Sequence, residues 1–427
     1  MTKTAKVVIG ANYGDEGKGL TTDAICAAAS KPIVIRFNGG AQAGHTVCDP
    51  DRRRHVFSHF GSGSLQGIPT FLSRFFVVLP RIFVYERSEL ERHGENPQVI
   101  CDPRAQVTTP YDVGINRAIE EARGAARHGS VGIGFGETIE RAENGYGLTV
   151  QDLTSEVRVR EVLAAIARDW LPRRLAKLGL PTDNATLARV ASPAEISRWQ
   201  AETAFMMTRV SVSPITTAIT GCTPAFEGAQ GLLLDMERGH SFPFVTRSNT
   251  GLKNVLALAI DAGIDQLDVT YMTRAYLTRH GAGPLPNELA ALDFAEIVDP
   301  TNRPNPWQGT LRFAPLDLDV LREAIAADLS DAASTALNIK AALGISCVDQ
   351  IRKTGVVFRN GTPIHVPRAA LSKVIAEAAG LPLAFESWGP TREDLHEASD
   401  HLLVSTLSHA NTPALMHQRT PGSISPC

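Results

Sequence analysis

The fold is decided by the segment Lys6-Val7-Val8-Ile9-Gly10-Ala11-Asn12-Tyr13-Gly14-Asp15-Glu16-Gly17-Lys18-Gly19. Its apolar start predicts a buried strand over residues 6–9, and its glycines predict a tight turn. The alanine-rich stretch 20–29 predicts a helix, and residues 32–37 predict a second strand. A strand, a glycine loop, a helix and a further strand form a β-α-β unit, whose strands run parallel. We therefore expect an α/β fold with a large, mostly parallel central sheet.

The segments outside this unit add helices and loops to it. Residues 115–127 form an amphipathic helical pattern, and residues 156–207 are mostly helical with expected breaks at Pro172, Pro181 and Pro193. The stretch 302–313 is rich in proline and asparagine, which predicts a surface loop. Because no repeat or linker interrupts the chain, we expect a single domain over residues 1–427, with a helical insertion at about 152–208.

Composition narrows the classes of function. The 427 residues are 43% hydrophobic and 20% charged, and the formal net charge is -3. Such a chain has no general attraction to nucleic acid or to anionic membranes. The six cysteines form no C-x-x-C pair, and the apolar runs are too short for a signal peptide or a membrane span. We expect a cytoplasmic enzyme with reduced thiols that binds neither nucleic acid nor membrane.

The loop from Gly10 to Gly19 is similar to a phosphate-binding loop without having its standard form. That form has a glycine where Asn12 stands and a Ser or Thr where Gly19 stands. Glycines still allow backbone N–H groups to face phosphate oxygens, and Lys18 adds a positive charge. Asp15 beside phosphates favours a bound magnesium ion or a proton on its carboxylate. The alternative is a tight strand-to-helix turn with solvated charges.

A second glycine loop, residues 38–46, follows the second predicted strand and contains His45. Loops at the carboxyl ends of parallel strands meet at one edge of the sheet, where ligands bind. A histidine there can give a proton to a leaving phosphate or stabilise its charge. The alternative is a histidine that is hydrogen-bonded to the backbone, and the expected neighbours Asp15 and Lys18 favour the catalytic interpretation.

Several motifs together resemble the adenylosuccinate synthetase family, in its order and roughly its spacing. They are Gly14-Asp15-Glu16-Gly17-Lys18-Gly19, Ala43-Gly44-His45-Thr46, Phe226-Glu227-Gly228-Ala229-Gln230-Gly231, Val245-Thr246-Arg247-Ser248-Asn249-Thr250, Thr278-Arg279-His280-Gly281-Ala282-Gly283-Pro284 and Ser387-Trp388-Gly389-Pro390. The resemblance implies a magnesium-dependent ligase that joins aspartate to C6 of IMP and hydrolyses GTP. It also implies a homodimer, and a C-terminal part, about residues 335–427, that binds the base of the triphosphate.

The resemblance also implies roles for individual residues. Asp15 would be the general base and a magnesium ligand together with the Gly44 carbonyl, His45 would assist the departing phosphate, and Lys18 would neutralise phosphate charge. Gln230 would contact the purine base. Further nucleotide contacts are expected at Gly14, Glu16, Gly17, Gly19, Asn38, Gly44, Thr46, Ser130, Thr246, Ser387 and Gly389.

Two departures concern the amino donor and the triphosphate. The family's T-T-G-R-R-R-R loop corresponds to residues 301–312, where Thr301, Arg303 and Arg312 are the candidates to bind the donor, although both arginines could be solvated loop charges. The family's guanine-reading T-K-L-D segment best matches residues 337–341, which contain no carboxylate, although Asp349 follows. GTP and ATP therefore both stay open as phosphate donors.

Two further departures concern the acceptor nucleotide. The family's cross-subunit arginine is missing from Asn144-Gly145-Tyr146-Gly147-Leu148, where Arg141 is the nearest basic residue, and its paired threonines become Ser130-Val131. These changes suggest a purine nucleotide other than IMP as one alternative. Phage relatives that aminate dGMP replace the aspartate retained here as Asp15, so an IMP-like acceptor is preferred.

The resulting hypothesis is ligation of aspartate to a 6-oxopurine nucleotide through a 6-phosphoryl intermediate. A paralogue in specialised metabolism or phage nucleotide chemistry is the close alternative. A non-catalytic nucleotide-binding regulator is the alternative from another class, but it would not need Asp15, Lys18, His45 and Gln230 together. A GTPase switch would need a Ser or Thr at position 19.

Overall fold

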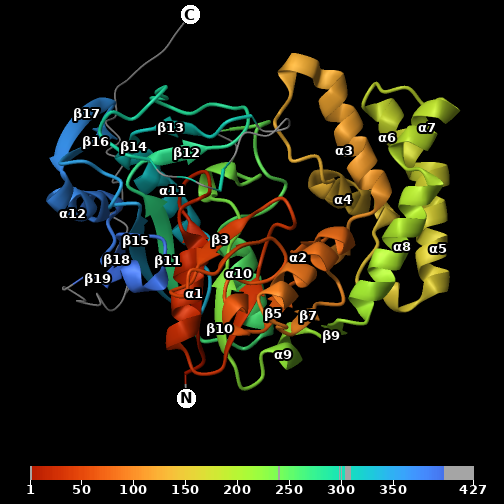
Figure 1. Cartoon of the computed structure of the whole chain (residues 1–427), viewed down its shortest axis with the longest axis horizontal. Helices are drawn as coiled ribbons and strands as arrows, with labels where there is room; N and C mark the ends of the chain where they lie inside the picture. The colour runs from red at the N-terminus through yellow and green to blue at the C-terminus, as the bar shows by residue number, and fades with distance from the viewer. Residues whose placement is uncertain (1, 239–240, 298, 300, 303–308, 399–427) are drawn as a thin grey trace, which may run out of the picture.

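A ten-stranded sheet crosses the centre of the computed structural model, which describes residues 2–238, 241–297, 299, 301–302 and 309–398 (Figure 1). Its strand order is β19-β18-β15-β11-β1-β10-β2-β5-β7-β9. Every neighbouring pair is parallel except β18 and β19. The predicted α/β fold with a large, mostly parallel central sheet is therefore confirmed.

The strands of this sheet are β1 (Thr4–Gly10), β2 (Pro32–Arg36), β5 (Thr70–Leu72), β7 (Val99–Cys101), β9 (Val210–Val212), β10 (Thr223–Glu227), β11 (Gln266–Arg274), β15 (Asn338–Ser346), β18 (Leu383–Ser387) and β19 (Leu395–Glu397). Smaller sheets pair β3 (His45–Cys48) with β4 (Arg54–Phe57), β6 (Val77–Val78) with β8 (Gln106–Val107), and β12 (Leu277–Arg279) with β13 (Arg312–Ala314). A further small sheet contains β14 (Leu316–Asp317), β16 (Thr354–Arg359) and β17 (Thr362–Pro367).

The α-helices are α1 (Lys18–Ala28), α2 (Pro80–Arg92), α3 (Pro110–Arg123), α4 (Phe135–Arg141), α5 (Glu156–Ala165), α6 (Leu171–Lys177), α7 (Asn184–Val190), α8 (Pro193–Met207), α9 (Ile215–Ala218), α10 (Leu252–Asp261), α11 (Leu318–Ser330) and α12 (Arg368–Ala379). Figure 1 shows α5 to α8 grouped at one side of the molecule, and α12 with β16 and β17 at the opposite side. Among the described residues, no helix is both long and apolar enough to cross a lipid bilayer.

The capping residues explain why α3 begins earlier than the pattern of residues 115–127 predicts. Pro110 occupies the first turn, where its missing N–H costs nothing. Thr109 and Asp112 form a capping box, in which the Asp112 carboxylate accepts hydrogen bonds from the Thr109 N–H and hydroxyl. The apolar periodicity alone missed this polar first turn.

Two other local predictions were wrong. Pro172 does not break the helical path, because a π-helical turn over Ile166–Trp170 leads directly into α6 and the proline lies in its first turn. The expected surface loop also ends sooner than predicted. Arg312 and Phe313 belong to β13 and pair with Arg279 and Thr278 of β12.

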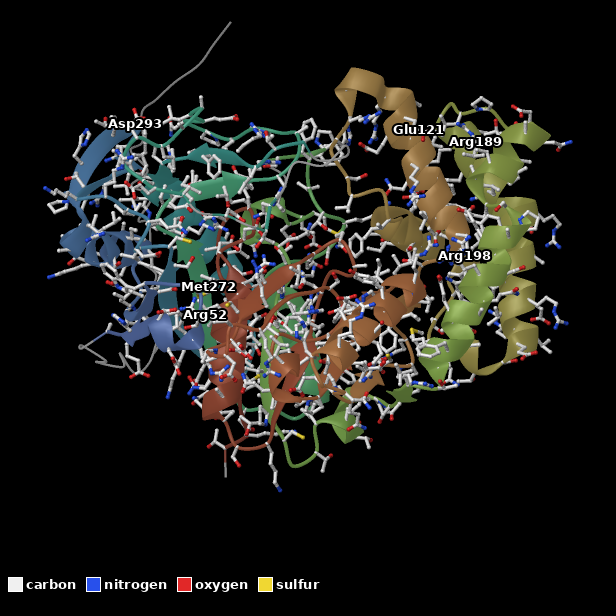
Figure 2. The ribbon with its side chains drawn as sticks, viewed as in Figure 1. Arg52, Glu121, Arg189, Arg198, Met272 and Asp293 are labelled. Carbon is white, nitrogen blue, oxygen red and sulfur yellow. The ribbon has the colours of Figure 1, made fainter. Side chains whose placement is uncertain are left out.

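Ion pairs between helices hold the helical side of the molecule together. Arg189 of α7 lies 3.4 Å from Glu121 of α3, and Figure 2 labels both side chains where the two helices face each other. The Arg174 guanidinium of α6 makes two 2.8 Å hydrogen bonds to the Glu137 carboxylate of α4. The fork of arginine matches a carboxylate in this bidentate geometry, so it fixes the orientation of α6 on α4.

Arg141 forms a fully buried ion pair with Asp112. Its Nε and Nη2 atoms donate to the two Asp112 oxygens at 2.8 and 3.0 Å, and Nη2 also donates to the Val107 carbonyl at 2.8 Å. Arg141 therefore braces α4 against α3 within its own chain. It is not available for the cross-subunit position to which it is the nearest basic residue in the sequence.

Replacement of Arg141 by methionine should lower the free energy of unfolding by about 3–5 kcal/mol, because the Asp112 charge would stay buried without its partner. Urea denaturation followed by circular dichroism measures this loss. Arg168→Met is the matched control, since Arg168 pairs with Asp169 on the surface and its loss should leave the urea midpoint near that of the wild type. Equal losses in both variants would contradict the bracing role of Arg141.

Candidate functional site

The candidate site lies at the carboxyl ends of the central strands. The loop after β1 contains Asp15, the loop after β2 leads to His45, and the loop after β10 contains Gln230. Because β1, β2 and β10 are adjacent and parallel, these loops emerge at the same edge of the sheet. The topology therefore places the predicted chemistry together, as the sequence motifs suggested.

The phosphate-type loop is closed by an internal carboxylate. Glu16 Oε1 accepts hydrogen bonds from the Asn12 and Gly14 amides at 3.0 and 2.8 Å, while Glu16 Oε2 lies 2.5 Å from Lys18 Nζ. Both charged side chains are buried. Helix α1 begins at Lys18 without a side-chain cap, so its first amides stay suited to an anion.

Gly19 explains why this loop lacks the usual Ser or Thr after its lysine. A Cβ atom at this position would come within 3.1 Å of the Thr46 carbonyl oxygen and 3.2 Å of the His45 Cβ. A larger side chain would push the His45 loop away from the lysine loop. A glycine at position 19, in place of the usual Ser or Thr, therefore leaves room for His45 beside the phosphate-type loop.

His45 is held in one orientation by buried Glu227. His45 Nδ1 lies 2.8 Å from Glu227 Oε1, and the other Glu227 oxygen accepts the Ser62 amide at 3.1 Å. Arg36 adds a positive charge 3.8 Å from the same carboxylate. His45 Nε2 is buried and has no hydrogen-bond partner among the described residues, so it is the ring atom left for a ligand.

Burial and neighbouring charges act in different ways on the pKa values of Glu227 and His45. Burial alone would raise the pKa of the Glu227 carboxyl, but the His45 contact and the Arg36 charge outweigh it and hold this pKa below its ordinary value. Burial lowers the pKa of His45, and the neighbouring Glu227 charge offsets this only in part. These shifts favour an ionised Glu227 carboxylate that accepts a hydrogen bond from His45 Nδ1.

Asp15 joins the phosphate-type loop to two other segments. Its Oδ2 atom lies 2.8 Å from His280 Nε2, and it accepts a hydrogen bond from Asn302 Nδ2 at 3.3 Å. The Asp15 carbonyl accepts a short hydrogen bond from Arg274 Nε. Burial would raise the pKa of the Asp15 carboxyl, but His280, Arg274 and Lys18 outweigh it and keep this pKa well below its ordinary value.

The donor atoms at Asp15 and Gly44 suit a hard cation such as Mg²⁺. The hydrogen bonds between the Asp15 carboxylate and described residues all use Oδ2, which leaves Oδ1 for another partner. The described residues contain no cluster of three or more metal-binding side chains. Magnesium is commonly held by one or two protein oxygens together with phosphates and water.

Two glutamines have buried side-chain polar atoms that are available to a ligand. Gln230 Oε1 and both side-chain polar atoms of Gln42 are buried without hydrogen-bond partners among the described residues. Gln42 Nε2 would lie 3.8 Å from a Cβ at Gly39, and that Cβ would contact Ala229, the neighbour of Gln230. Buried amides without partners are costly, so a ligand with its own donors and acceptors would satisfy them.

The other predicted acceptor contacts have partners within the chain. The Asn38 amide exchanges two hydrogen bonds with the Ala229 backbone at 2.7 and 3.0 Å, so it links β2 to β10. Ser130 accepts a hydrogen bond from Asn116 Nδ2 at 3.0 Å. Thr246 is buried and its amide donates to the Leu234 carbonyl at 2.8 Å, while its neighbour Arg247 pairs with Glu140 and Glu143.

The stretch 337–341, the best match to the family's guanine-reading segment, lies at the amino end of β15. It begins β15, whereas the carboxyl end of β15 reaches the site through Ser346, which donates a 3.1 Å hydrogen bond to the Glu16 carbonyl. Ser387 and Gly389 lie beside this end, because Ser387 closes the adjacent β18 and its carbonyl accepts the Val348 amide. The carboxyl end of β15 therefore lies beside the phosphate-type loop, and Asp349 follows it in the chain.

The predicted amino-donor residues have different surroundings. Thr301 lies beside Thr46, with 3.3 Å between their hydroxyl oxygens, while Arg303 lies outside the described residues. Arg312 is fully engaged, because it binds the Glu288 carboxylate and donates to the Gly281 and Gly283 carbonyls at 3.0 and 2.8 Å. Arg54 of β4 also contacts the Thr301 hydroxyl.

Sequence reasoning assigned no role to five residues that the fold brings to the site: Gln42, Arg54, Glu227, Arg274 and His280. Gln42, Glu227 and His280 lie within motifs or loops that the sequence singled out, so their positions carried a signal. Arg54 and Arg274 lie on strands without a motif. Only the packing of β4 and β11 against distant loops reveals them.

Comparison with known proteins finds one matching family model and several relatives of similar sequence. Residues 7–330 match the family model described as adenylosuccinate synthetase. The adenylosuccinate synthetase of Anaeromyxobacter dehalogenans is 36% identical over 293 residues, which cover 66% of this chain and 65% of that protein. The Ralstonia pickettii enzyme of the same name is 34% identical over 300 residues, with 69% and 65% covered. The matched part thus spans slightly less than two thirds of these relatives' length.

Two solved structures share the fold. Fully ligated adenylosuccinate synthetase from Plasmodium falciparum superposes with a TM-score of 0.69 at 16% identity, over 92% of this chain and 99% of that one. Cyanophage S-2L succinoaminodeoxyadenylate synthetase (PurZ), bound to dGMP and to dATP as an energy donor, gives 0.59 at 15% identity, over 93% and 96%. Because the family model matches residues 7–330, well over half of its length, the chain belongs to the adenylosuccinate synthetase family.

Proposed function

We propose that the protein is a C–N ligase that joins aspartate to C6 of a 6-oxopurine nucleotide at the expense of a nucleoside triphosphate. The observation that carries the proposal is the meeting of Asp15, Lys18 and His45 at adjoining loops, where His45 Nε2 has no hydrogen-bond partner in the described part of the chain. A base, a cation and an imidazole arranged around a helix N-terminus match the needs of phosphoryl transfer to a poorly reactive oxygen.

In the first proposed step, the Asp15 carboxylate accepts the proton from N1 of the purine. The electrons of the N1–H bond shift to O6, which attacks the γ-phosphorus while the bond to the bridging β-phosphate oxygen breaks. His45 Nε2 faces the departing diphosphate, whose negative charge favours a proton on the ring, with Glu227 holding Nδ1. A magnesium ion held by Asp15 and Gly44 would neutralise phosphate charge.

In the second step, the amino group of aspartate attacks C6, the bond between C6 and the phosphorylated oxygen breaks, and inorganic phosphate leaves while the new C–N nitrogen gives up a proton to that phosphate or to water. The attack is easier on this intermediate than on the free purine, because phosphate is a far better leaving group than an oxide. Thr301 and Asn302 lie beside Asp15 and His280, so we assign the amino donor to this side.

Lys18 must change partners during the first step. Its ammonium group pairs with Glu16 in the present structure, and a triphosphate has to compete with that carboxylate. The phosphate offers more negative charge and more acceptor oxygens than the carboxylate, so the exchange is favourable. Glu16 thereby keeps a buried lysine charge paired until the nucleotide binds.

Purified protein with magnesium should release phosphate only when a triphosphate, an acceptor nucleotide and aspartate are all present. The assay crosses GTP and ATP with IMP, dGMP and no acceptor, and it follows the product by mass. The expected product is the succinyl-amino nucleotide of IMP, and chelation of magnesium should stop its formation. A product from dGMP alone would identify the acceptor as the one bound by the cyanophage protein. If no combination released phosphate or gave a product, the proposal would be overturned and a nucleotide-binding regulator would be favoured.

Asp15→Asn should reduce turnover by about two to four orders of magnitude, because the amide cannot accept the N1 proton. Asparagine is the informative replacement, since Asp15 has a positive φ of 60° that asparagine tolerates and alanine does not. Steady-state phosphate release measures the effect. Asp51→Asn removes an exposed carboxylate from the nearby hairpin and serves as the control. Comparable turnover in Asp15→Asn and the control would remove Asp15 from the base role.

Glu227→Gln should lower kcat by up to about 10²-fold and leave the KM values nearly unchanged, because the neutral amide stabilises a protonated His45 less well. The comparison variant is Ser62→Ala, which removes the hydrogen bond that the Ser62 hydroxyl donates to Glu227 but leaves the Glu227 charge. Glu227→Gln should be the slower enzyme. If both variants lose the same activity, Glu227 only braces the loop and its charge has no catalytic role.

A further inference from the structure

The β3–β4 ribbon has two faces with different environments. Alternation along the strands places His45 and Val47 on the buried face, with His55 and Phe57 opposite them. Thr46 and Arg54 lie on the outer face, as diagonal neighbours in the same register. One ribbon therefore presents His45 to the phosphate-type loop and, at the same time, presents Thr46 and Arg54 to residues 301–302.

Thr301 is where this outer face meets the amino-donor side of the site. Its hydroxyl accepts a 3.3 Å hydrogen bond from the Thr46 hydroxyl and a short one from Arg54 Nη2. The next residue, Asn302, donates to the Asp15 carboxylate at 3.3 Å. Arg54 is therefore connected to the proposed base, Asp15, through Thr301 and its neighbour Asn302, and has no direct contact with it.

The other described arginines near this point are already paired. Arg312 makes a bidentate contact with Glu288 and binds two carbonyls. Arg274 is buried against the Asp15 carbonyl and lies 3.9 Å from Asp299. Arg54 is exposed, and its one hydrogen bond within the described part of the chain goes to a neutral hydroxyl. Its guanidinium charge faces no carboxylate there.

We propose that Arg54 binds a carboxylate of the amino donor, with Thr301 beside it. The inference rests on the proposed ligase function and names a residue that fixes the class of its second substrate, an amino acid with a carboxylate on its side chain. Arginine has five N–H donors in a fork that matches a carboxylate, and only one of them is used by Thr301. A carboxylate held here leaves the donor's amino group on the side of Asn302 and Asp15.

Arg54→Ala should raise the KM for aspartate by about 10- to 100-fold, the loss expected for a charge-assisted hydrogen bond. The KM values for the triphosphate and the acceptor should stay within about twofold of the wild type, since those ligands bind at other loops. Arg52→Asn is the matched control. Arg52, labelled in Figure 2, carries the same charge on the same hairpin, and asparagine tolerates its positive φ of 64°. The control should keep the wild-type KM for aspartate.

A second pair of variants separates charge recognition from bracing of Thr301. Arg54→Gln keeps an N–H donor for the Thr301 hydroxyl but loses the positive charge, so it should behave like Arg54→Ala. Thr301→Val removes the hydroxyl and leaves the Arg54 charge, so it should raise the KM for aspartate less than Arg54→Ala does. A near-normal KM in Arg54→Gln, or an equal rise in Arg52→Asn, would overturn the proposal.

The donor itself supplies a further check. Alanine lacks the side-chain carboxylate of aspartate, so Arg54→Ala should weaken ligation of aspartate far more than any residual ligation of alanine. Equal weakening of both donors would show that Arg54 does not read that carboxylate through its charge.

The first half-reaction distinguishes failure of this inference from failure of the proposed function. With acceptor and magnesium but no aspartate, oxygen-18 in the β,γ-bridge of the triphosphate should scramble through reversible 6-phosphoryl formation. Arg54→Ala should scramble the label at the wild-type rate. Loss of scrambling in Arg54→Ala alone would place Arg54 in the phosphoryl step and overturn its assignment to the donor. Absence of scrambling and of ligation in the wild type would overturn the ligase proposal itself.

Discussion

Burying a carboxylate is unfavourable unless donors surround it, and three carboxylates lie at the carboxyl edge of this sheet. Glu16 is satisfied by two loop amides and Lys18, Glu227 by His45 and the Ser62 amide, and Asp15 by His280 and Asn302. The Glu16 contacts close a single loop, whereas the Glu227 and Asp15 contacts join segments that are distant in the sequence. The need to satisfy these charges is therefore what brings the loops of the site to their positions, and the sheet supplies only the common edge.

This arrangement has a consequence for ligand binding. The Lys18 ammonium and two loop amides already have an acceptor in Glu16, so a nucleotide replaces existing hydrogen bonds and does not enter an empty cradle. His45 Nε2, Gln230 Oε1 and the Gln42 amide, in contrast, are buried without partners among the described residues. The site thus contains two kinds of polar group. The donors bound to Glu16 must give up a hydrogen bond to bind a ligand, whereas the atoms without partners gain one with no such loss.

Much of this could be predicted from the sequence, for identifiable physical reasons. Residues 6–37 specify the β-α-β unit because apolar runs, glycines and a helix alternate there over short distances. The motifs also placed Asp15, Lys18 and His45 at one edge. A match to a few letters cannot tell the amino end of a strand from its carboxyl end, and the stretch 337–341 falls at the amino end of β15. Arg312 looked free, whereas strand pairing of β13 with β12 delivers it to Glu288.

The proposed amino-donor side of the site shows why the positions of arginine side chains are difficult to predict from the sequence. The segment 301–312 has lost most of the basic cluster typical of the family, and comparison along that loop alone predicts a weakened site. In space, however, Arg54 reaches Thr301 from the β3–β4 ribbon, whose position is fixed from its other face by His45 and Glu227. A long, flexible side chain can supply a charge from any element within reach, so its origin in the sequence is weakly constrained. The charge on the donor side is then a property of the packed loops, and a change in one loop can be compensated from a ribbon some 250 residues away along the chain.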